Sequence, residues 1–337
     1  MSAQIAATDA LPVQRIDWIP VALVPALALA ALPMVPSGST WVTLTVAGLA
    51  MGMMIFMMAS GLTLVFGLMD VMNFAHGVFI SIGAYAAASV LRTMTPSMQA
   101  PSLLSNLSAM FPAICAAMLL AGLLGWFFER VVIRPVYGDH LRQILVTMGG
   151  LIVFEQLIHV VWGPEIIPLE RPATLSGSFL LGDAALERYR LLAVVVGLAV
   201  FAAMWLLLNR TRLGLLIRAG VENREMVESL GYRVRRLFVA VFVAGSALAG
   251  LGGVMWGTYQ GSVNAQMGMQ VMVVLFIVLI IGGLGSIGGC FVGALLVGLA
   301  TNYAGFLYPK LALGSSILLM VLILLWRPRG LYPVGKA

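Results

Sequence analysis

Apolar residues form long stretches along this chain, separated by short polar segments. A helix needs about 20 mainly apolar residues to cross a bilayer, whereas the strands of a membrane barrel alternate apolar and polar positions. The stretches therefore predict an all-α fold, a polytopic transmembrane bundle of about ten spans. The expected spans lie near residues 18–36, 41–68, 74–91, 111–131, 143–163, 191–208, 238–260, 270–284, 289–307 and 311–326.

The composition excludes most other classes of protein. Of the 337 residues, 61% are hydrophobic and 9% are charged, against roughly 45–50% and 25% in soluble chains. So few charges cannot cover a water-facing surface, which excludes a soluble enzyme, a nucleic-acid-binding protein and a disordered chain. The formal net charge of +6 fits loops that are retained on the cytoplasmic side of a membrane. The expected surroundings are a lipid bilayer, and we expect no nucleic-acid partner.

The apolar stretches divide the chain into three parts. We expect a polar cytoplasmic segment at 1–17, a transmembrane domain at 18–326 and a cytoplasmic tail at 327–337. The longest inner loop is expected at about 209–237 and the longest outer loop at about 164–190. Neither loop has room for a catalytic or nucleotide-binding module, and no His, Cys or carboxylate cluster has the spacing of metal ligands. We therefore expect no enzymatic activity, no cofactor and no metal on this chain.

The positive charges favour one orientation of these spans. Ten spans place both termini on the same side, and cytoplasmic loops are enriched in Arg and Lys. With the termini inside, most of the 19 Arg and Lys residues fall on inner segments, and the tryptophans fall near span ends. Both patterns predict cytoplasmic N and C termini. Spans 2–5 and 7–10 then start from opposite sides, as inverted repeats require. The basic residues expected outside are Arg92, Arg171, Arg188, Arg190 and Lys310.

Polar residues interrupt the apolar pattern just after the second expected span. Asp70, Asn73 and His76 are spaced three residues apart, so a helix would place them on one face. Unwound or polar-interrupted helices are where transporters bind substrates, which makes Asn73 and His76 candidates for the substrate pathway. The alternative is an inner loop in which Asp70 and Asn73 cap the next helix.

A second polar pair lies in the middle of the fifth expected span. Glu155 and His159 are four residues apart. Ionisable side chains at that depth are costly and usually face the interior of a bundle or a water-filled cavity. The pair is therefore either a polar patch on the substrate pathway or a structural pair that joins helices.

Glycine is frequent in the expected spans, with 37 residues in the chain. Pairs at four-residue spacing, such as Gly48 and Gly52, let helices approach closely, and we expect them to pack within this chain. Residues 282–289 read GGLGSIGG, which is too rich in glycine for a regular helix. This segment predicts either a tight turn at the inner face or a pore-lining turn at Gly282 and Gly285.

The inner loop mixes basic and acidic residues on both sides of Gly231. It is either a solvated loop that serves only retention, or it forms a short amphipathic helix over 218–230 along the inner surface. A transmembrane bundle that has no nucleotide-binding site of its own needs such a segment, which a separate energy-supplying protein can contact and move.

Three blocks of sequence carry a resemblance to a known family. They read GLTLVFGLMDVMNFAHGVFISIGAY at 61–85, RAGVENREMVESLGYRVRRLFVAVFVAGSALAGLGGVMWG at 218–257 and IGGLGSIGGCFVGALLVGL at 281–299. They resemble the branched-chain amino-acid permease family of ABC importers, and the NFAHG stretch is closer to the LivH-type subunit than to the LivM-type one. The resemblance covers most of 41–335 and implies a multi-pass subunit of the bacterial inner membrane.

The resemblance also implies partners and site residues. The expected partners are a second, LivM-type permease subunit, two ATPase subunits that bind ATP and Mg²⁺ inside, and a periplasmic substrate-binding protein. The family's NFAHG motif matches residues 73–77, and its ATPase-coupling loop matches residues 222–231. The coupling residues expected on this basis are Glu222, Asn223, Arg224, Glu228 and Gly231.

The function implied by the resemblance is the import of branched-chain amino acids by ATP-driven alternating access. Similar proteins also move urea, short amides or aromatic acids, so the substrate stays open among these. An ion-coupled secondary transporter or channel is the alternative from another class, and it predicts acidic residues deep in several spans. Only Glu155 clearly lies at such a depth, which favours the importer.

Overall fold

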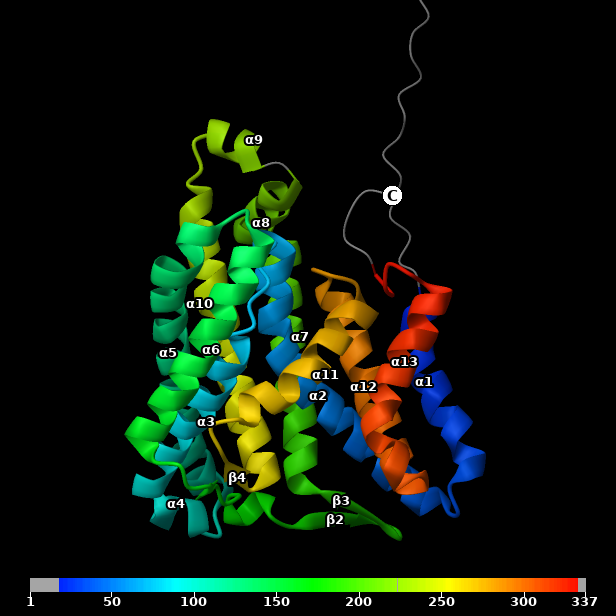
Figure 1. Cartoon of the computed structure of the whole chain (residues 1–337). Coiled ribbons are helices and arrows are strands. Elements are labelled where there is room, and N and C mark those ends of the chain that lie inside the picture. The colour runs from blue at the N-terminus through cyan, green and yellow to red at the C-terminus, as the bar shows by residue number, and fades with distance from the viewer. Residues whose placement is uncertain (1–17, 223, 333–337) are drawn as a thin grey trace, which may run out of the picture.

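Helices standing side by side form nearly all of the structure, a computed structural model that describes residues 18–222 and 224–332 (Figure 1). The α-helices are α1 (Ile19–Ala31), α2 (Gly38–Met69), α3 (His76–Thr93), α4 (Thr95–Gln99), α5 (Leu103–Phe128), α6 (His140–Trp162), α7 (Arg188–Arg210), α8 (Arg212–Glu222), α9 (Arg224–Ser229), α10 (Val234–Gln260), α11 (Met267–Gly282), α12 (Ile287–Leu307) and α13 (Ala312–Trp326). Short 3₁₀ or π turns are η1 (Leu32–Met34), η2 (Glu129–Ile133), η3 (Arg134–Val136), η4 (Ala173–Leu175) and η5 (Pro309–Leu311). The strands are β1 (Ile167–Pro168), β2 (Ser178–Leu181), β3 (Ala184–Glu187) and β4 (Ser262–Val263).

Every predicted apolar stretch forms a helix, which confirms the helical membrane bundle. Six helices in the described chain are long and apolar enough to cross a bilayer: Gly38–Gly67, Leu103–Val136, His140–Trp162, Arg188–Arg210, Val234–Gln260 and Ile287–Leu307. Three further apolar helices are shorter: Ile19–Met34, Met267–Gly282 and Gly314–Trp326. The chain is therefore a multi-pass membrane protein.

The core of the bundle is built around α2, which lies against α10 and α12. α2 is mostly buried, whereas α6 and α7 expose most of their apolar side chains. Glycines permit the close contacts of α2: a Cβ on Gly52 would lie 2.8 Å from the carbonyl oxygen of Ala294 in α12. The Gly48–Gly52 pair thus packs within the chain, as predicted. Trp256 lies near the end of α10, as predicted for the tryptophans, and its side chain is buried in the core.

Two core helices end in the same unusual way. α2 is capped by Asp70 (φ 50°) and α10 by Gly261 (φ 76°), both in the left-handed region. The next helices, α3 and α11, begin at His76 and Met267, so the same short break follows each cap. In Figure 1, α2 and α10 run in opposite directions, and so do α3 and α11. The two helix–break–helix units thus run in opposite directions, while the inverted repeats predicted for spans 2–5 and 7–10 stay a prediction.

The first turns of α3 and α11 lie against each other inside the bundle. A Cβ on Gly77 would come within 2.9 Å of the backbone carbonyl carbon of Gly268. Ser81 fastens this contact, because its hydroxyl donates to the carbonyl of Ala265 (2.9 Å) and accepts from the N–H of Gly268 (2.9 Å). The fold thus joins two breaks that are far apart in the sequence.

One end of the bundle, called here the strand end, carries α4 and the four short strands (Figure 1). β1 pairs with β4 and β2 with β3, both antiparallel. The guanidinium of Arg171 holds the loop to the end of α10, because it donates to the carbonyls of Thr258 (3.3 Å) and Tyr259 (2.7 Å). It also forms an ion pair with Glu187 in β3 (3.1 Å). β1, β2 and β3 lie in the outer loop predicted at about 164–190, and β4 lies between the spans predicted at 238–260 and 270–284. All four strands are an addition to the all-α prediction.

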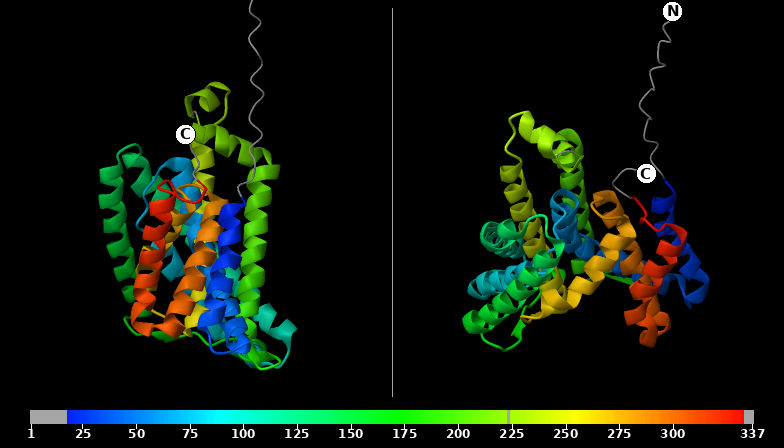
Figure 2. Two further views of the ribbon diagram at one scale, coloured as in Figure 1. Left: turned by 90° about the vertical axis from the view of Figure 1, so that its right-hand side faces the viewer. Right: turned by 45° about the horizontal axis from the view of Figure 1, so that its top comes forward.

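The opposite end, called here the α9 end, carries α8 and α9 (Figure 2). α1 begins and α13 ends at this same end of the bundle (Figures 1 and 2). Within the segment predicted as an amphipathic helix over 218–230, the structure shows helix at the end of α8 and along α9, on either side of residue 223, which lies outside the described residues. The polar segment predicted at 1–17 and the last residues of the predicted tail, 333–337, lie outside the described residues.

Candidate functional site

The break between α2 and α3 begins at Asp70 and is not helical. The N–H of Asp70 donates to the carbonyl of Phe66 (3.0 Å), and its exposed carboxylate faces His140 at 3.5 Å. Because residues 70–75 leave the helix, Asp70, Asn73 and His76 do not share a helical face, and that prediction is wrong. The capping alternative is also wrong, since α3 is preceded by Ala75 and no side chain caps it.

From Asp70 the break descends into the bundle. The N–H of Phe74 donates to the hydroxyl of Thr147 in α6 (3.3 Å), and the ring of Phe74 contacts that of Phe276 in α11 at 5.0 Å. Thr147 lies two turns further along α6 than His140, which faces Asp70. At a rise of 1.5 Å per residue, Thr147 is therefore about 10 Å deeper in the bundle than His140. Non-helical backbone at such depth persists only where it is buried in protein or lines a cavity.

Asn73 and His76 are both fully buried in this break. His76 Nε2 lies 3.0 Å from the carbonyl of Met58, while its Nδ1 has no protein partner. Neither Oδ1 nor Nδ2 of Asn73 has a protein partner. A buried polar group left unpaired costs about 1–3 kcal/mol, so these side chains are candidates for contact with a substrate or with water in another conformation. Their predicted place on the substrate pathway stays a prediction.

The second break contains a counterpart of Asn73. Asn264 precedes α11 by the same spacing that separates Asn73 from α3, and its Oδ1 is buried without a protein partner. The signal for this equivalence is visible in the sequence, where NFAHG at 73–77 and NAQMG at 264–268 share an Asn four residues before a Gly. The breaks thus bring two asparagines with unpaired polar atoms to the region where α3 and α11 meet.

Glu155 and His159 lie elsewhere, on the partly exposed helix α6. In the described chain neither side chain makes a hydrogen bond or ion pair, and His159 Nδ1 is buried without a partner. The pair therefore does not join helices within this chain. The structure does not bring it together with Asn73 and His76, and its part in the substrate pathway stays a prediction.

The glycine segment forms a tight turn between α11 and α12. Gly283 (φ 92°) and Gly285 (φ 80°) adopt left-handed conformations that other residues rarely reach. A Cβ on Gly282 would lie 2.5 Å from the backbone of Gly289, and a Cβ on Gly285 would lie 2.8 Å from Cα of Gly67. The structure thus confirms the tight turn, while a pore-lining role of Gly282 and Gly285 stays a prediction.

The predicted coupling residues lie at the α9 end. Asn223 lies outside the described residues, and the side chains of Glu222 and Arg224 are likewise not described. Gly231 ends this segment in a left-handed conformation (φ 84°), where its N–H donates to the carbonyl of Glu228 (2.9 Å). Beside it is a cavity of about 530 Å³. Its charged lining residues are Arg130, Glu228, Arg233, Arg235 and Arg236.

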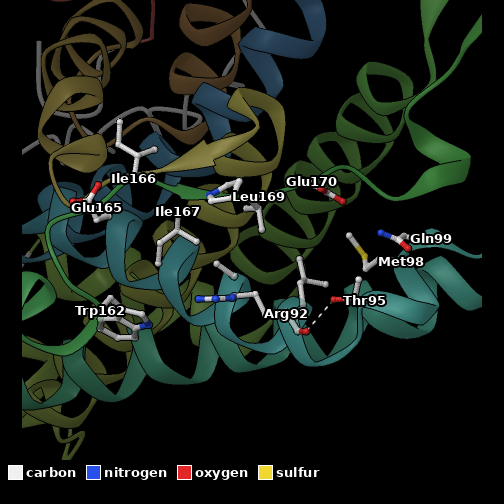
Figure 3. Close-up of a pocket in the computed structure, with 13 residues that line it drawn as sticks. Arg92, Thr95, Met98, Gln99, Trp162, Glu165, Ile166, Ile167, Leu169 and Glu170 are labelled. Atoms are coloured by element: carbon white, nitrogen blue, oxygen red, sulfur yellow. Dashed lines mark hydrogen bonds between the residues drawn. The ribbon is translucent and has the colours of Figure 1, made fainter.

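A second pocket, of about 460 Å³, opens at the strand end (Figure 3). The ends of α3 and α6, helix α4 and residues 165–170 line it, and its walls are mainly apolar. In Figure 3, Arg92 lies on the helical wall, and Glu165 and Glu170 lie on the loop opposite. The spacing of Arg92, Glu165 and Glu170 along the chain does not show that they meet, so the sequence alone does not identify this site.

Comparison with known proteins identifies the family. The profile of the branched-chain amino acid transport system / permease component matches residues 44–326. The chain belongs to this family. The permease BraD of Pseudomonas aeruginosa is 30% identical over 296 residues, covering 84% of this chain and 93% of BraD. LivH of Escherichia coli K12 is 26% identical over 295 residues, which cover 84% of this chain and 92% of LivH. No solved structure matches the chain significantly.

The family matches include both types of permease. LivM of Escherichia coli K12 is 27% identical over 312 residues, covering 84% of this chain and 69% of LivM. The resemblance to the LivH type made from the NFAHG stretch is confirmed by the LivH and BraD matches. The chain is thus a transport permease of the inner membrane rather than an enzyme.

Proposed function

We propose that this chain is the LivH-type permease subunit of an ABC importer that carries branched-chain amino acids into the cell. The observation that carries the proposal is the family match over residues 44–326. The breaks at Asn73 and Asn264 support it, because transporters bind solutes near the midplane where helices are unwound.

Ten helices cross the membrane in this proposal, namely α1, α2, α3, α5, α6, α7, α10, α11, α12 and α13. The α9 end faces the cytoplasm and the strand end faces the periplasm. The arginines at 210, 212, 233, 235 and 236 support this orientation, since all lie near the α9 end. The shorter helices α1, α11 and α13 cross at a slant or in a region where the bilayer is thinned.

The proposed partners are a second, LivM-type permease subunit, two ATPase subunits and a periplasmic substrate-binding protein. The exposed apolar side chains of α6 and α7 face lipid or the second permease. ATP and Mg²⁺ bind to the ATPase subunits, because the described part of this chain consists almost entirely of the bundle itself. The ATPase subunits push on α8 and α9, and Gly231 is the joint between α9 and α10.

The two joined breaks support the alternating access that we propose. ATP-driven movement of α9 displaces α10, which carries the second break at its other end. The contact between Gly77 and Gly268 couples that break to the first, and Asn73, His76 and Asn264 then gain solute or water as partners. Opening at the α9 end and at the strand end thus alternates about one polar region inside the bundle.

The test is uptake by the assembled importer in proteoliposomes. Leucine uptake should require ATP on the ATPase side and the binding protein on the other, and the tagged chain should co-purify with an ATPase without crosslinker. The variant Gly231→Ala should lower uptake per ATP hydrolysed, because a side chain at φ 84° strains the joint by about 1–2 kcal/mol. Gly182→Ala is the matched control: Gly182 is also left-handed (φ 60°), has no neighbouring atoms in reach of a Cβ, and lies in the β2–β3 turn.

Three results would contradict the proposal. Equal coupling in the Gly231→Ala and Gly182→Ala importers would remove the coupling role of this segment. Uptake of urea, short amides or aromatic acids in place of leucine would overturn the substrate. Accumulation of solute by the chain alone, driven by a proton or sodium gradient, would overturn the class of transporter.

A further inference from the structure

We propose that the pocket at the strand end is a receiving site for one free amino acid, bound as a zwitterion before it enters the bundle. This inference rests on the proposed function and adds a binding site to it. The pocket has the size of small-molecule sites, which measure roughly 300–1,000 Å³ and combine apolar walls with a few polar groups.

The charges of the pocket match the charges of an amino acid. Arg92 on the helical wall and the carboxylates of Glu165 and Glu170 on the loop are exposed to the pocket (Figure 3). In the described chain none of these three side chains makes an ion pair or hydrogen bond. Opposite charges that line one pocket without neutralising each other suit a ligand that carries both signs. The guanidinium receives the α-carboxylate, and a loop carboxylate receives the α-ammonium.

The walls of the pocket match an aliphatic side chain. Leu91, Met98, Ile167 and Leu169 line it and are themselves buried, so their positions are fixed by the fold. Trp162 closes one side, and its indole N–H donates to the hydroxyl of Ser89 (2.8 Å). A branched aliphatic chain gains about 25 cal/mol per Å² of apolar surface that it removes from water here, whereas a polar side chain would leave its hydrogen-bonding groups unpaired.

The position of the pocket fits a step just before translocation. β1, at Ile167 and Pro168, forms part of its wall and pairs with Val263 and Ser262 of the second break. A ligand that moves the 165–170 loop therefore also moves the strand that leads to Asn264. Occupancy of the pocket and opening of the second break are thus mechanically connected.

The experiment measures binding of three probes to the full-length chain in lipid nanodiscs. L-leucine carries both charges, L-leucinamide lacks the carboxylate, and 4-methylpentanoate lacks the ammonium group. We expect L-leucine to bind at least tenfold more tightly than either analogue. Arg92→Gln should weaken L-leucine at least tenfold without weakening L-leucinamide, and Arg92→Lys should restore part of the affinity. Glu165→Gln or Glu170→Gln should weaken L-leucine and leave 4-methylpentanoate unchanged.

Lys310→Gln is the control, because Lys310 is an exposed cation predicted on the same side of the membrane and does not line the pocket. It should leave the affinity for L-leucine unchanged. Equal L-leucine binding by the Arg92→Gln, Lys310→Gln and unaltered chains would overturn the pocket. The receiving site is also wrong if Arg92→Gln weakens the docking of a binding protein but leaves the binding of free L-leucine unchanged.

Failure of the pocket is distinguishable from failure of the proposed function. If the assembled importer takes up leucine and its Arg92→Gln variant does so with unchanged apparent affinity, the function stands and the receiving site is wrong. If the unaltered importer takes up no branched-chain amino acid but the chain binds L-leucine in the pocket, the site stands and the transport proposal is wrong.

Discussion

The crossing of α2 and α10 at Gly61 allows a quantitative test of the fold. A Cβ added to Gly61 would overlap the carbonyl oxygen of Gly245 and would lie 2.9 Å and 3.1 Å from its carbonyl carbon and Cα. Carbon atoms in contact lie about 3.5–4.0 Å apart. Because its three nearest neighbours all belong to the backbone of Gly245, no rotation of a side chain relieves the overlap, and the two helices must separate.

The expected cost follows from two opposing terms. Overpacking of a core costs about 1–3 kcal/mol, and a rigid backbone contact belongs at the upper end of that range. Ala gains about 1 kcal/mol over Gly from helix propensity, so Gly61→Ala should destabilise the bundle by about 2 kcal/mol. Gly149→Ala in α6 is the matched control, since a Cβ there meets no atom within 4 Å, and it should be neutral or stabilising by up to about 1 kcal/mol.

The assay is reversible unfolding of the purified chain in mixed micelles, followed by tryptophan fluorescence. The two variants should differ by about 3 kcal/mol, which is more than a hundredfold in the unfolding equilibrium. Gly245→Ala strains the same gap, because its Cβ would lie 2.7 Å from the carbonyl oxygen of Gly61. The double variant Gly61→Ala with Gly245→Ala should therefore cost less than the sum of the single variants. Equal stability of Gly61→Ala and Gly149→Ala would refute the close crossing.

Three further substitutions test other parts of the structure. Asn73→Leu should stabilise the chain by about 1–3 kcal/mol in the same unfolding assay, since it removes a buried polar group without partners, and should abolish uptake; a destabilised variant with normal uptake would contradict this. Ser81→Ala removes the hydrogen bonds that join α3 to Ala265 in the second break and to Gly268 in α11, and it should cost about 2 kcal/mol. Ser108→Ala on the exposed face of α5 is the neutral control. Arg171→Gln breaks the bonds to Thr258, Tyr259 and Glu187, so protease added at the strand end should cut the 164–190 segment faster; unchanged cleavage would exclude Arg171 as its anchor.

The sequence predicted the helices well because each span carries its own signal, a stretch of apolar residues whose length matches the bilayer. The glycine turn was predictable for a related reason, since GGLGSIGG at 282–289 offers no regular helix any local advantage. The strands of the outer loop were missed because two- and four-residue ladders such as β1 and β2 depend on a partner segment for their hydrogen bonds. The pocket with Arg92 was missed because its lining comes from two segments, 88–99 and 162–170, that lie far apart in the sequence.

The break at residues 70–75 shows where sequence reasoning fails for a physical reason. Local propensity favours one continuous helix or a capped loop, and the chain adopts neither, because Thr147, Phe276 and Ser81 hold the two breaks in place from other helices. Such tertiary contacts must outweigh the cost of leaving Asn73 unpaired. An unpaired buried polar group raises the free energy of the conformation in which it lacks partners. If the group has partners in a second conformation, the free-energy difference between the two conformations becomes smaller. Under the proposed alternating access, in which Asn73 gains partners in another conformation, its burial here keeps the described conformation from becoming too stable to leave.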